Sequence, residues 1–316
     1  MKLLSEHSVS AALAAVVGGW GLGSRRVLMI RHGMLSRLHW FLIVSVLATT
    51  VAASPIESEV EVAPGVPGTF AAPPGEGAAG SPVGNVVVLL HGWTGNRDDA
   101  GGLFKDLAAR LADQGTASLR IDFRGEGERN GHRLTSTFGT RIADAEAALA
   151  FARKRYPSAK LGVVGFSLGG AAALAVVGRQ PDAVKSLVLW STAGDIAVDF
   201  FTTEDMKPAV RQAMEKGEAP YQSWAPMTLT REHLTGFLGY DLFGPLSAYH
   251  GALLGIRGTD DFLPRYEDRI LAAAGAAPEE AVVIGGADHI YNVLDPKTSR
   301  AERLLTLTAR WFADTL

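Results

Sequence analysis

The sequence has no cysteine among its 316 residues, and its 8 histidines include no pair at the short spacing of a motif such as H-E-x-x-H. The first absence excludes thiol nucleophiles, disulfide bonds and lipid attachment to cysteine. The second leaves no short metal-binding motif. The formal net charge is only −3, so no excess of basic residues favours nucleic acid as a partner. We expect no metal, no other cofactor and no nucleic-acid partner.

Long apolar runs are scarce, and the one near the N-terminus is short. Residues 34–53 begin with the basic stretch Met34–His39, continue with the apolar stretch Trp40–Val51 and end in small residues. This order is typical of a secretory signal peptide, with cleavage after Ala53. It predicts a secreted or periplasmic protein. A membrane span needs about 20 apolar residues, so we expect no stable membrane partner unless this segment stays uncleaved.

The chain is long enough for one large core, since 47% of its residues are hydrophobic and α/β folds of this length often form one domain. Residues 1–33 are an N-terminal extension to which we assign no role. Residues 54–84 are rich in Pro, Gly, Ala and Glu, which predicts a solvated linker with one strand-like stretch at Val60–Val62. Residues 85–316 are then expected to form the main folded domain. No oligomeric state is indicated.

The most informative motif is Gly165-Phe166-Ser167-Leu168-Gly169. It follows an apolar strand-like run and opens an Ala-rich helical stretch, which is the context of a nucleophile elbow. Glycines on both sides of Ser167 permit a tight, strained turn that projects the hydroxyl above the strand edge. The motif predicts that Ser167 is a nucleophile, whereas the alternative is a serine that only caps the following helix.

A serine nucleophile needs a base and a group that orients the base. His289 follows the last strand-like run, Ala281–Ile284, and is the predicted base. An earlier strand-like run, Leu253–Arg257, is followed by the adjacent aspartates Asp260 and Asp261. Successive side chains at a strand end point in opposite directions, so only one faces His289. We favour Asp261 and keep Asp260 as the alternative. The order Ser, Asp, His is that of α/β-hydrolases.

An acyl-transfer site also needs donors for an oxyanion. The apolar run Asn85–Leu90 leads directly into His91-Gly92-Trp93-Thr94-Gly95-Asn96. We expect the donors to be the backbone N–H groups of Leu168, just after the nucleophile, and of Trp93 in this loop. His91 is interpreted as a brace for the loop rather than as a second catalytic histidine.

Strand and helix patterns alternate through much of the domain. Helical patterns at Leu103–Gln114 and Arg141–Arg155 alternate with strand patterns at Ala117–Phe123 and Ser186–Trp190, which predicts a mostly parallel sheet covered by helices on both faces. Asp122 and Arg124, at the same sheet edge as Ser167, are expected to be structural.

The alternation stops at about residues 192–250, which we interpret as a small lid above the nucleophile. Its aromatic residues either line a substrate pocket or form the lid's own core; they are Phe200, Phe201, Tyr221, Trp224, Phe237, Tyr240 and Phe243.

Five stretches in this order resemble the serine esterases of the α/β-hydrolase superfamily, over about residues 65–316. They are His91–Asn96, Ser118–Gly127, Asp144–Leu149, Gly165–Gly170 and Gly286–His289. Within the superfamily, the chain is most similar to the bacterial cinnamoyl or feruloyl esterase-like group. It differs from that group in carrying Trp93 where Phe is usual, Phe166 and Leu168 around the serine, and Glu128 where serine is frequent.

Together these features predict a serine carboxylesterase with the α/β-hydrolase fold. The triad Ser167, Asp261 and His289 would hydrolyse small-molecule esters through an acyl-enzyme. The resemblance implies small acyl or aromatic (phenolic) acid esters as substrates. The alternatives are an amidase or peptidase, an acyltransferase, and a non-catalytic binding member of the fold.

Overall fold

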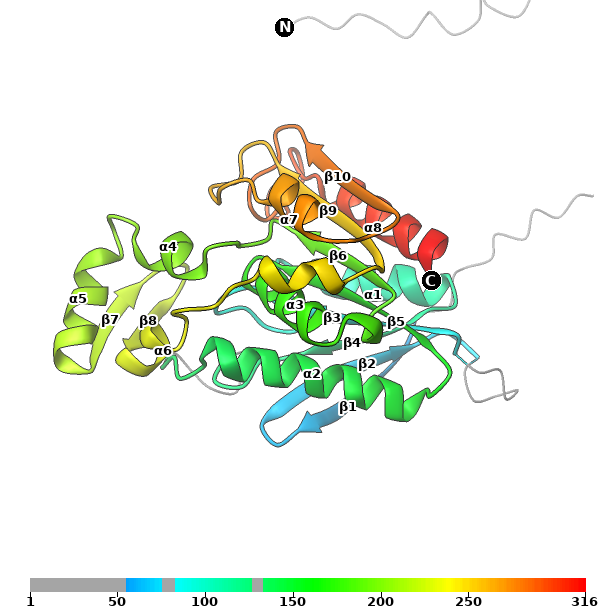
Figure 1. Cartoon of the computed structure of the whole chain (residues 1–316), viewed down its shortest axis with the longest axis horizontal. Coiled ribbons are helices and arrows are strands. Elements are labelled where there is room, and N and C mark those ends of the chain that lie inside the picture. The colour runs from blue at the N-terminus through cyan, green and yellow to red at the C-terminus, as the bar shows by residue number, and fades with distance from the viewer. Residues whose placement is uncertain (1–54, 76–82, 127–132) are drawn as a thin grey trace, which may run out of the picture. The chain divides into compact units, whose positions relative to one another are not determined.

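The computed structural model describes residues 55–75, 83–126 and 133–316. Eight strands form one sheet in the order β1-β2-β4-β3-β5-β6-β9-β10 (Figure 1). β1 and β2 pair antiparallel, as do β2 and β4, while every pair from β4 to β10 is parallel. The strands are β1 (Ile56–Ala63), β2 (Val66–Ala72), β3 (Asn85–Leu90), β4 (Ala117–Ile121), β5 (Lys160–Phe166), β6 (Ser186–Trp190), β9 (Ala252–Gly258) and β10 (Glu279–Ile284).

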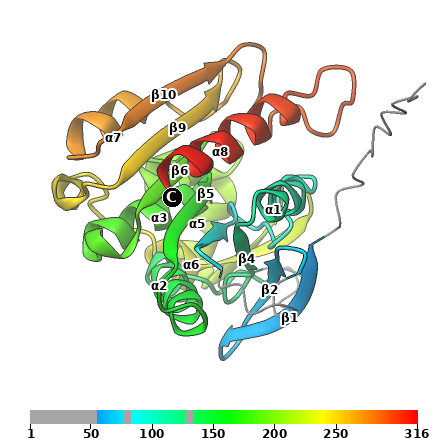
Figure 2. The same ribbon diagram turned by 90° about the vertical axis from the view of Figure 1, so that its right-hand side faces the viewer.

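Helices cover both faces of the sheet, as the alternating pattern predicts (Figures 1 and 2). α1 (Leu103–Asp113) and α8 (Ala301–Thr315) pack on one face. The other face carries α2 (Phe138–Arg155), α3 (Leu168–Arg179) and α7 (Glu267–Ala273), with a short 3₁₀ helix, η1 (Pro181–Ala183), following α3.

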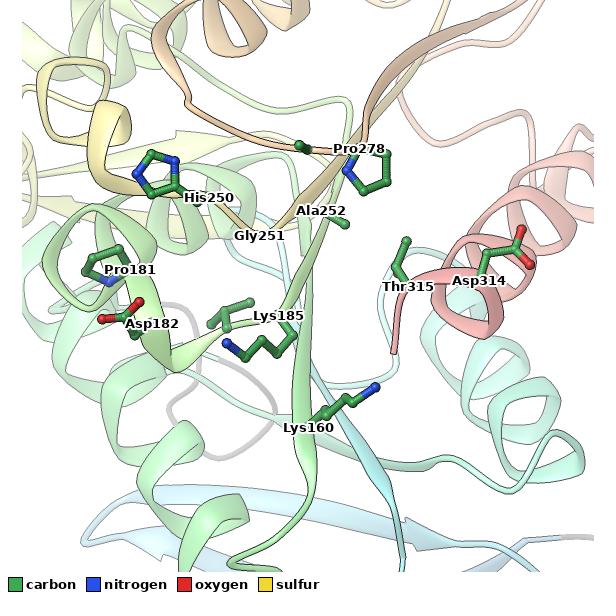
Figure 3. A pocket seen from close by; sticks show the side chains of 12 residues that line it. Lys160, Pro181, Asp182, Lys185, His250, Gly251, Ala252, Pro278, Asp314 and Thr315 are labelled. Atoms are coloured by element: carbon green, nitrogen blue, oxygen red, sulfur yellow. The ribbon is translucent and has the colours of Figure 1, made fainter.

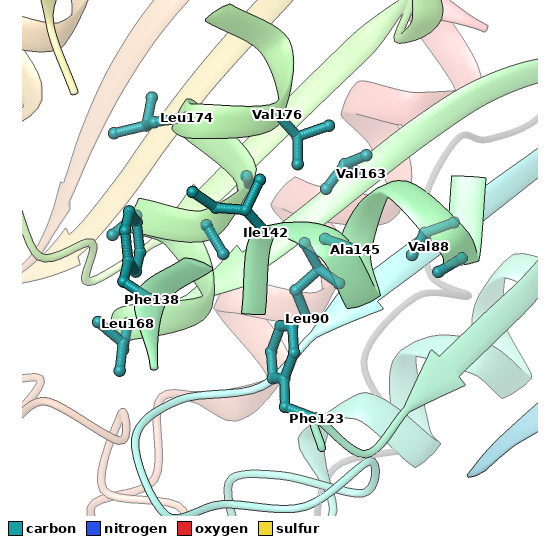
Figure 4. Close-up of a cluster of buried hydrophobic side chains, with 14 of the residues drawn as sticks. Val88, Leu90, Phe123, Phe138, Ile142, Ala145, Val163, Leu168, Leu174 and Val176 are labelled. Atoms are coloured by element: carbon teal, nitrogen blue, oxygen red, sulfur yellow. The ribbon is translucent and has the colours of Figure 1, made fainter. Parts of the chain in front are cut away.

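Strand β3 illustrates how a continuous apolar run serves both layers. Val86, Val88 and Leu90 belong to the core beneath α2 and α3, and Val87 and Leu89 to the core beneath α1 and α8. Successive strand residues point to opposite faces, so a strand buried on both faces has to be apolar at every position. The larger core is shown in Figure 4, where the residues drawn include Val88, Leu90, Phe123, Phe138, Ile142 and Leu168.

The predicted linker, residues 54–84, is largely two strands, and the strand-like stretch predicted at Val60–Val62 lies within the first of them. Within residues 54–84, β1 and β2 are long strands that extend the main sheet from its β4 side. Every residue of β2 is buried. The Glu side chains of β1 alternate with other residues on an exposed outer strand, and this composition resembles that of a linker.

The insert between β6 and β9 contains a small cap. It comprises α4 (Ile196–Phe201), α5 (Lys207–Lys216), the hairpin β7 (Glu218–Gln222) and β8 (Pro226–Thr230), and α6 (Arg231–Thr235). These elements gather beside one edge of the sheet in Figure 1. The second 3₁₀ helix, η2 (Gly244–Ala248), packs against α3 instead of the cap. The two helices are so close that a Cβ placed on Gly178 of α3 would lie 2.7 Å from Pro245 Cβ. The cap therefore ends before residue 250.

The predicted signal segment, residues 34–53, and the extension before it lie outside the described residues. In the part of the chain that is described, no helix combines the length and apolar character needed to cross a membrane.

Candidate active site

Ser167 occupies a strained turn between β5 and α3. Its backbone has φ 54° and ψ −117°. A residue other than glycine adopts such a backbone conformation at a cost of about 1–3 kcal/mol. The turn packs so tightly that a Cβ on Gly165 would lie 2.5 Å from Gly170 Cα, and one on Gly169 would lie 2.0 Å from Leu90 O. The two motif glycines are therefore required by close backbone contacts.

The structure brings the three predicted triad residues together. His289 Nε2 lies 3.0 Å from Ser167 Oγ, and His289 Nδ1 lies 2.8 Å from Asp261 Oδ1. Asp260 has other partners, since its carboxylate accepts a hydrogen bond from the Thr259 hydroxyl. Asp261 is thus the aspartate that contacts the imidazole, as expected from the sequence.

The two loops that carry Asp261 and His289 meet because β9 and β10 are parallel neighbours whose carboxyl ends lie at the same edge. Asp260 N donates a hydrogen bond of 2.9 Å to Ala287 O. A Cβ on Gly258 would lie only 1.9 Å from the same oxygen. Gly258 therefore permits the close approach that sets the Asp261 to His289 distance.

The Asp261 carboxylate is fully buried and held from several sides. Burial favours its neutral form, but the hydrogen bonds from His289 and from Leu263 N and the nearby His289 charge outweigh burial and keep the pKa of Asp261 below its usual value. The Arg257 guanidinium adds positive charge 3.7 Å from Asp261 Oδ2. An ionised Asp261 accepts a hydrogen bond from the Nδ1–H of His289. This keeps the proton on Nδ1 and leaves Nε2 free to accept a hydrogen bond from Ser167.

Two phenylalanine rings hold the His289 imidazole. The ring centroids of Phe166 and Phe262 lie 5.1 Å and 4.4 Å from that of the imidazole. Phe262 is 67% exposed, so it covers His289 on the solvent side. Phe166 belongs to the nucleophile motif, whereas Phe262 has no motif signal beyond its place next to Asp261.

Both predicted oxyanion donors are at the serine. Gly92 lies directly against it, since a Cβ there would be 3.3 Å from Ser167 Cβ, and Trp93 follows Gly92. Leu168 opens helix α3, whose N-terminal amides favour negative charge. Among the described residues, neither the Trp93 nor the Leu168 backbone N–H donates a hydrogen bond. Both are therefore available to an incoming oxygen.

His91 braces this loop, as the sequence analysis predicted. Its Nδ1 donates to Gly92 O at 2.8 Å and its Nε2 accepts from Phe123 N at 3.0 Å. Burial, with help from the Arg141 charge, lowers the pKa of His91 to about 4, so the ring is neutral and can make both bonds.

The loop also depends on charged residues that the sequence analysis did not identify. Arg141 Nη2 donates to His91 O at 3.1 Å and to Gly92 O at 2.8 Å. Glu126 pairs with Arg141 at 3.5 Å and accepts a hydrogen bond from Thr94 N at 2.8 Å. The sequence signal for Arg141 is its position on the buried face of helix α2. A charged residue there needs a buried partner, because charged side chains are almost never fully buried unless they are paired.

Asp122 and Arg124 are structural, in agreement with the sequence analysis. Asp122 Oδ1 accepts a hydrogen bond from Arg97 N at 2.7 Å. Arg124 pairs with the buried Asp144 of α2 at 2.6 Å. These contacts fasten the loop after β4 to its neighbours.

A cavity of about 620 Å³ opens at Ser167 and His289. Of the lid aromatics, Phe200, Tyr221 and Trp224 line it, whereas Phe201 and Phe237 pack against each other and around His233. The two interpretations of the lid aromatics thus apply to different residues. Three carboxylates also line the cavity, those of Asp99, Asp199 and Asp205.

A second cavity, of about 390 Å³, lies at the opposite edge of the sheet. Lys160 at the start of β5, Lys185 just before β6 and His250 just before β9 contribute to its lining (Figure 3). Since the triad lies at the carboxyl ends of the strands, this cavity is not part of the site at Ser167.

A family model described as serine aminopeptidase, S33, matches residues 81–235. The match includes Ser167 and ends before Asp261. A stretch of 107 residues is 37% identical to the pimeloyl-[acyl-carrier protein] methyl ester esterase of Chromobacterium violaceum, covering 34% of this chain and 37% of that protein. The chain thus matches little more than a third of that relative's length.

Solved structures resemble the chain over most of its length. Est1E from Butyrivibrio proteoclasticus with bound ferulic acid has a TM-score of 0.64 at 17% identity, covering 82% of this chain and 98% of Est1E. A dienelactone hydrolase from Anabaena variabilis has a TM-score of 0.54 at 18% identity, covering 84% and 100%. At such identities the similarity establishes the fold.

Proposed function

We propose that this chain, which has the α/β-hydrolase fold, is a serine carboxylesterase acting through an acyl-enzyme on Ser167. The observation that carries this proposal is the continuous chain of contacts from Asp261 Oδ1 to His289 Nδ1 at 2.8 Å and from His289 Nε2 to Ser167 Oγ at 3.0 Å. These contacts lie beside two backbone N–H groups that have no acceptor among the described residues.

The first half of the reaction forms the acyl-enzyme. Ser167 Oγ attacks the ester carbonyl carbon while its proton passes to His289 Nε2. The carbonyl oxygen becomes an oxyanion and accepts hydrogen bonds from the backbone N–H groups of Trp93 and Leu168. The carbon–oxygen bond to the alcohol then breaks, and the alcohol leaves with the proton from His289.

Water completes the cycle. His289 removes a proton from a water molecule, whose oxygen attacks the acyl carbon, and the same two N–H groups stabilise the second oxyanion. When the bond to Ser167 breaks, His289 returns the proton to Oγ and the acid is released. Asp261 remains ionised throughout and stabilises the imidazolium that forms in each half.

The substrates we propose are uncharged esters of small acyl or aromatic acids. Support comes from the lining of the cavity, where Trp93, Phe200, Met206, Trp224 and Phe262 provide apolar and aromatic contacts. Such a lining suits a substrate whose acyl or aryl group is apolar and whose polar atoms are those of the reacting ester.

The test is ester hydrolysis by the full chain and by Ser167→Ala. We expect turnover of 4-nitrophenyl acetate to fall at least about 10³-fold in the variant, and a fluorophosphonate probe to label the native protein at Ser167 only. Full activity in Ser167→Ala would contradict the proposal. Absence of labelling in folded native protein would favour a non-catalytic binding role. Comparing the turnover of methyl ferulate with that of short aliphatic esters then shows which acyl groups the protein prefers.

One observation favours peptide-bond hydrolysis as a second candidate. The matched family model is described as serine aminopeptidase, and the carboxylates of Asp99 and Asp205 in the cavity could pair with the ammonium group of a peptide N-terminus. Turnover of leucine 4-nitroanilide at a rate comparable to that of leucine 4-nitrophenyl ester would support this candidate, while turnover of the ester alone would support the esterase.

A further inference from the structure

Trp93 takes part in the site in two ways at once. Its backbone N–H is an oxyanion donor in the proposed function, and its indole reaches α6 of the cap. From this we infer that Trp93 is a positioning residue: its hydrogen bond to His233 lets the cap set the orientation of the oxyanion donor. The inference rests on the proposed function.

The peptide plane that carries the donor is held from behind. Gly92 O accepts hydrogen bonds from Arg141 Nη2 and from His91 Nδ1, both at 2.8 Å. In a trans peptide the C=O and the next N–H point in opposite directions. The Trp93 N–H therefore points away from these two buried groups, to the side where a substrate oxygen would lie.

The indole fixes the other end of the same residue. Trp93 Nε1 donates to His233 Nε2 at 3.0 Å. His233 can accept there because its Nδ1 donates to Ser136 O at 2.6 Å, which places the single proton of the neutral ring on Nδ1. His233 is fully buried, and burial lowers its pKa. The Phe200 ring, 5.9 Å from that of Trp93, packs beside it.

The next residue is also tied to the cap. Thr94 has a positive φ of 55°, its N–H donates to Glu126, and its hydroxyl donates to Trp93 O at 2.6 Å and accepts from Trp224 Nε1 at 2.8 Å. The Trp93 backbone thus lies between two anchored peptide groups. The indole hydrogen bond adds a directional constraint on Trp93 to the ring contacts that the indole makes with Phe200 and Phe201, and all of these partners belong to the cap.

This arrangement predicts an effect on the transition state rather than on substrate binding. A donor that is held in place stabilises the oxyanion without reorganisation, whereas the uncharged carbonyl of the bound ester depends on it less. Loss of the indole hydrogen bond should therefore lower kcat and leave KM nearly unchanged. The phenylalanine that is usual in the resembled group cannot make this bond.

The experiment compares Trp93→Phe, which keeps a ring and the backbone N–H but removes the indole donor, with His233→Gln, whose amide can accept from the indole and donate to Ser136 O. We expect kcat for 4-nitrophenyl acetate to fall about tenfold in Trp93→Phe, as for the loss of about 1.4 kcal/mol, with KM within about twofold. His233→Gln should retain most of the activity. The inhibition constant of a trifluoromethyl ketone, whose adduct carries an oxyanion, should rise in parallel with the loss of kcat/KM.

The matched control is Tyr266→Phe. It removes another hydrogen bond that anchors the cap, from the Tyr266 hydroxyl to Asp199 Oδ1 at 2.8 Å, without touching the oxyanion loop. We expect it to lower Tm as much as Trp93→Phe does while kcat stays within about twofold of the native value. If Trp93→Phe changes only Tm or KM, or if Tyr266→Phe reduces kcat equally, the inference is wrong. If the native protein shows no turnover that depends on Ser167, the proposed function fails instead.

Discussion

At the residue scale, two adjacent aspartates have different environments. The Asp261 side chain is fully buried and bonded to His289, whereas Asp260 is exposed and accepts a hydrogen bond from Thr259. The residues carry the same chemical group, so their difference comes from direction: after β9 the carboxylate of Asp260 is turned to solvent and that of Asp261 is turned inward. This pair therefore offers an internal control for the role of the triad acid.

We predict that Asp261→Asn lowers kcat by about 10³–10⁴-fold, because an amide in that position favours the wrong imidazole tautomer and does not stabilise the imidazolium. Asp260→Asn, the same change one residue away, should keep kcat within about twofold. Steady-state kinetics on 4-nitrophenyl acetate, with Tm measured for both variants, checks the prediction. Equal losses in the two variants would show that Asp261 has no special role.

At the scale of elements, the site depends on how helix α3 lies against strand β3. Gly169 is in the first turn of α3, and its Cα faces the carbonyl groups at the end of β3. This contact brings the Ser167 turn beside the loop that contains Gly92 and Trp93. A contact between two backbone segments thus sets the distance between the nucleophile and the oxyanion loop. It leaves no room for a side chain at residue 169.

We predict that Gly169→Ala destabilises the protein by about 1–3 kcal/mol, because its Cβ would meet Leu90 O at 2.0 Å and backbone atoms must shift. Gly285→Ala is the control, since a Cβ there meets nothing within 4 Å. It should change stability by less than about 0.5 kcal/mol. Urea denaturation followed by circular dichroism measures both, and a Gly169→Ala variant as stable as the control would refute the packing argument.

At the scale of the whole molecule, the cavity combines an apolar lining with negative charge. Asp99, Asp199 and Asp205 line it, and neither lysine nor arginine is among its lining residues in the described part of the chain. Hydrogen bonds from the side chains of Thr203 and Tyr221 keep the pKa of Asp205 below its usual value. Burial raises the pKa of Asp99 to about 6, against the opposing effects of the Gly92 N–H and of the charges on Arg141 and His289. The cavity therefore becomes more negative as pH rises through about 6.

We predict that mono(4-nitrophenyl) adipate is hydrolysed with a kcat/KM about tenfold lower than that of 4-nitrophenyl hexanoate, since charge repulsion of about 1.4 kcal/mol has that effect. Because Asp99 loses its proton in this range, the ratio should widen from pH 6 to pH 8, and it should narrow with added salt. Asp205→Asn should reduce the ratio of the two kcat/KM values about threefold. Glu215→Gln removes an exposed cap carboxylate outside the cavity and should leave this ratio unchanged. Equal turnover of the two esters at pH 8 would rule out selection by charge.

Much of this protein follows from local sequence. The βα alternation and the strand β6 (Ser186–Trp190) could be read directly, because buried parallel strands need continuous apolar runs. The positions of Ser167, His289 and Asp261 followed from glycine-rich turns after strands. The parallel order of those strands then places all three side chains at one edge. In each case the structural requirement is met within a few residues, so the sequence is sufficient to recognise it.

Other features were decided only by the tertiary structure. The sequence predicts only the Val60–Val62 part of β1 and nothing of β2, because most of β1 is exposed and carries no apolar signal. The network of Arg141, Glu126, His233 and Trp93 joins residues separated by as many as 140 positions. Hydrogen bonds between such distant groups depend on the packing of cap against sheet, which leaves no periodic pattern in the chain. The sequence alone thus determined the fold and the reacting groups, and the tertiary contacts decided what holds the oxyanion donor in place.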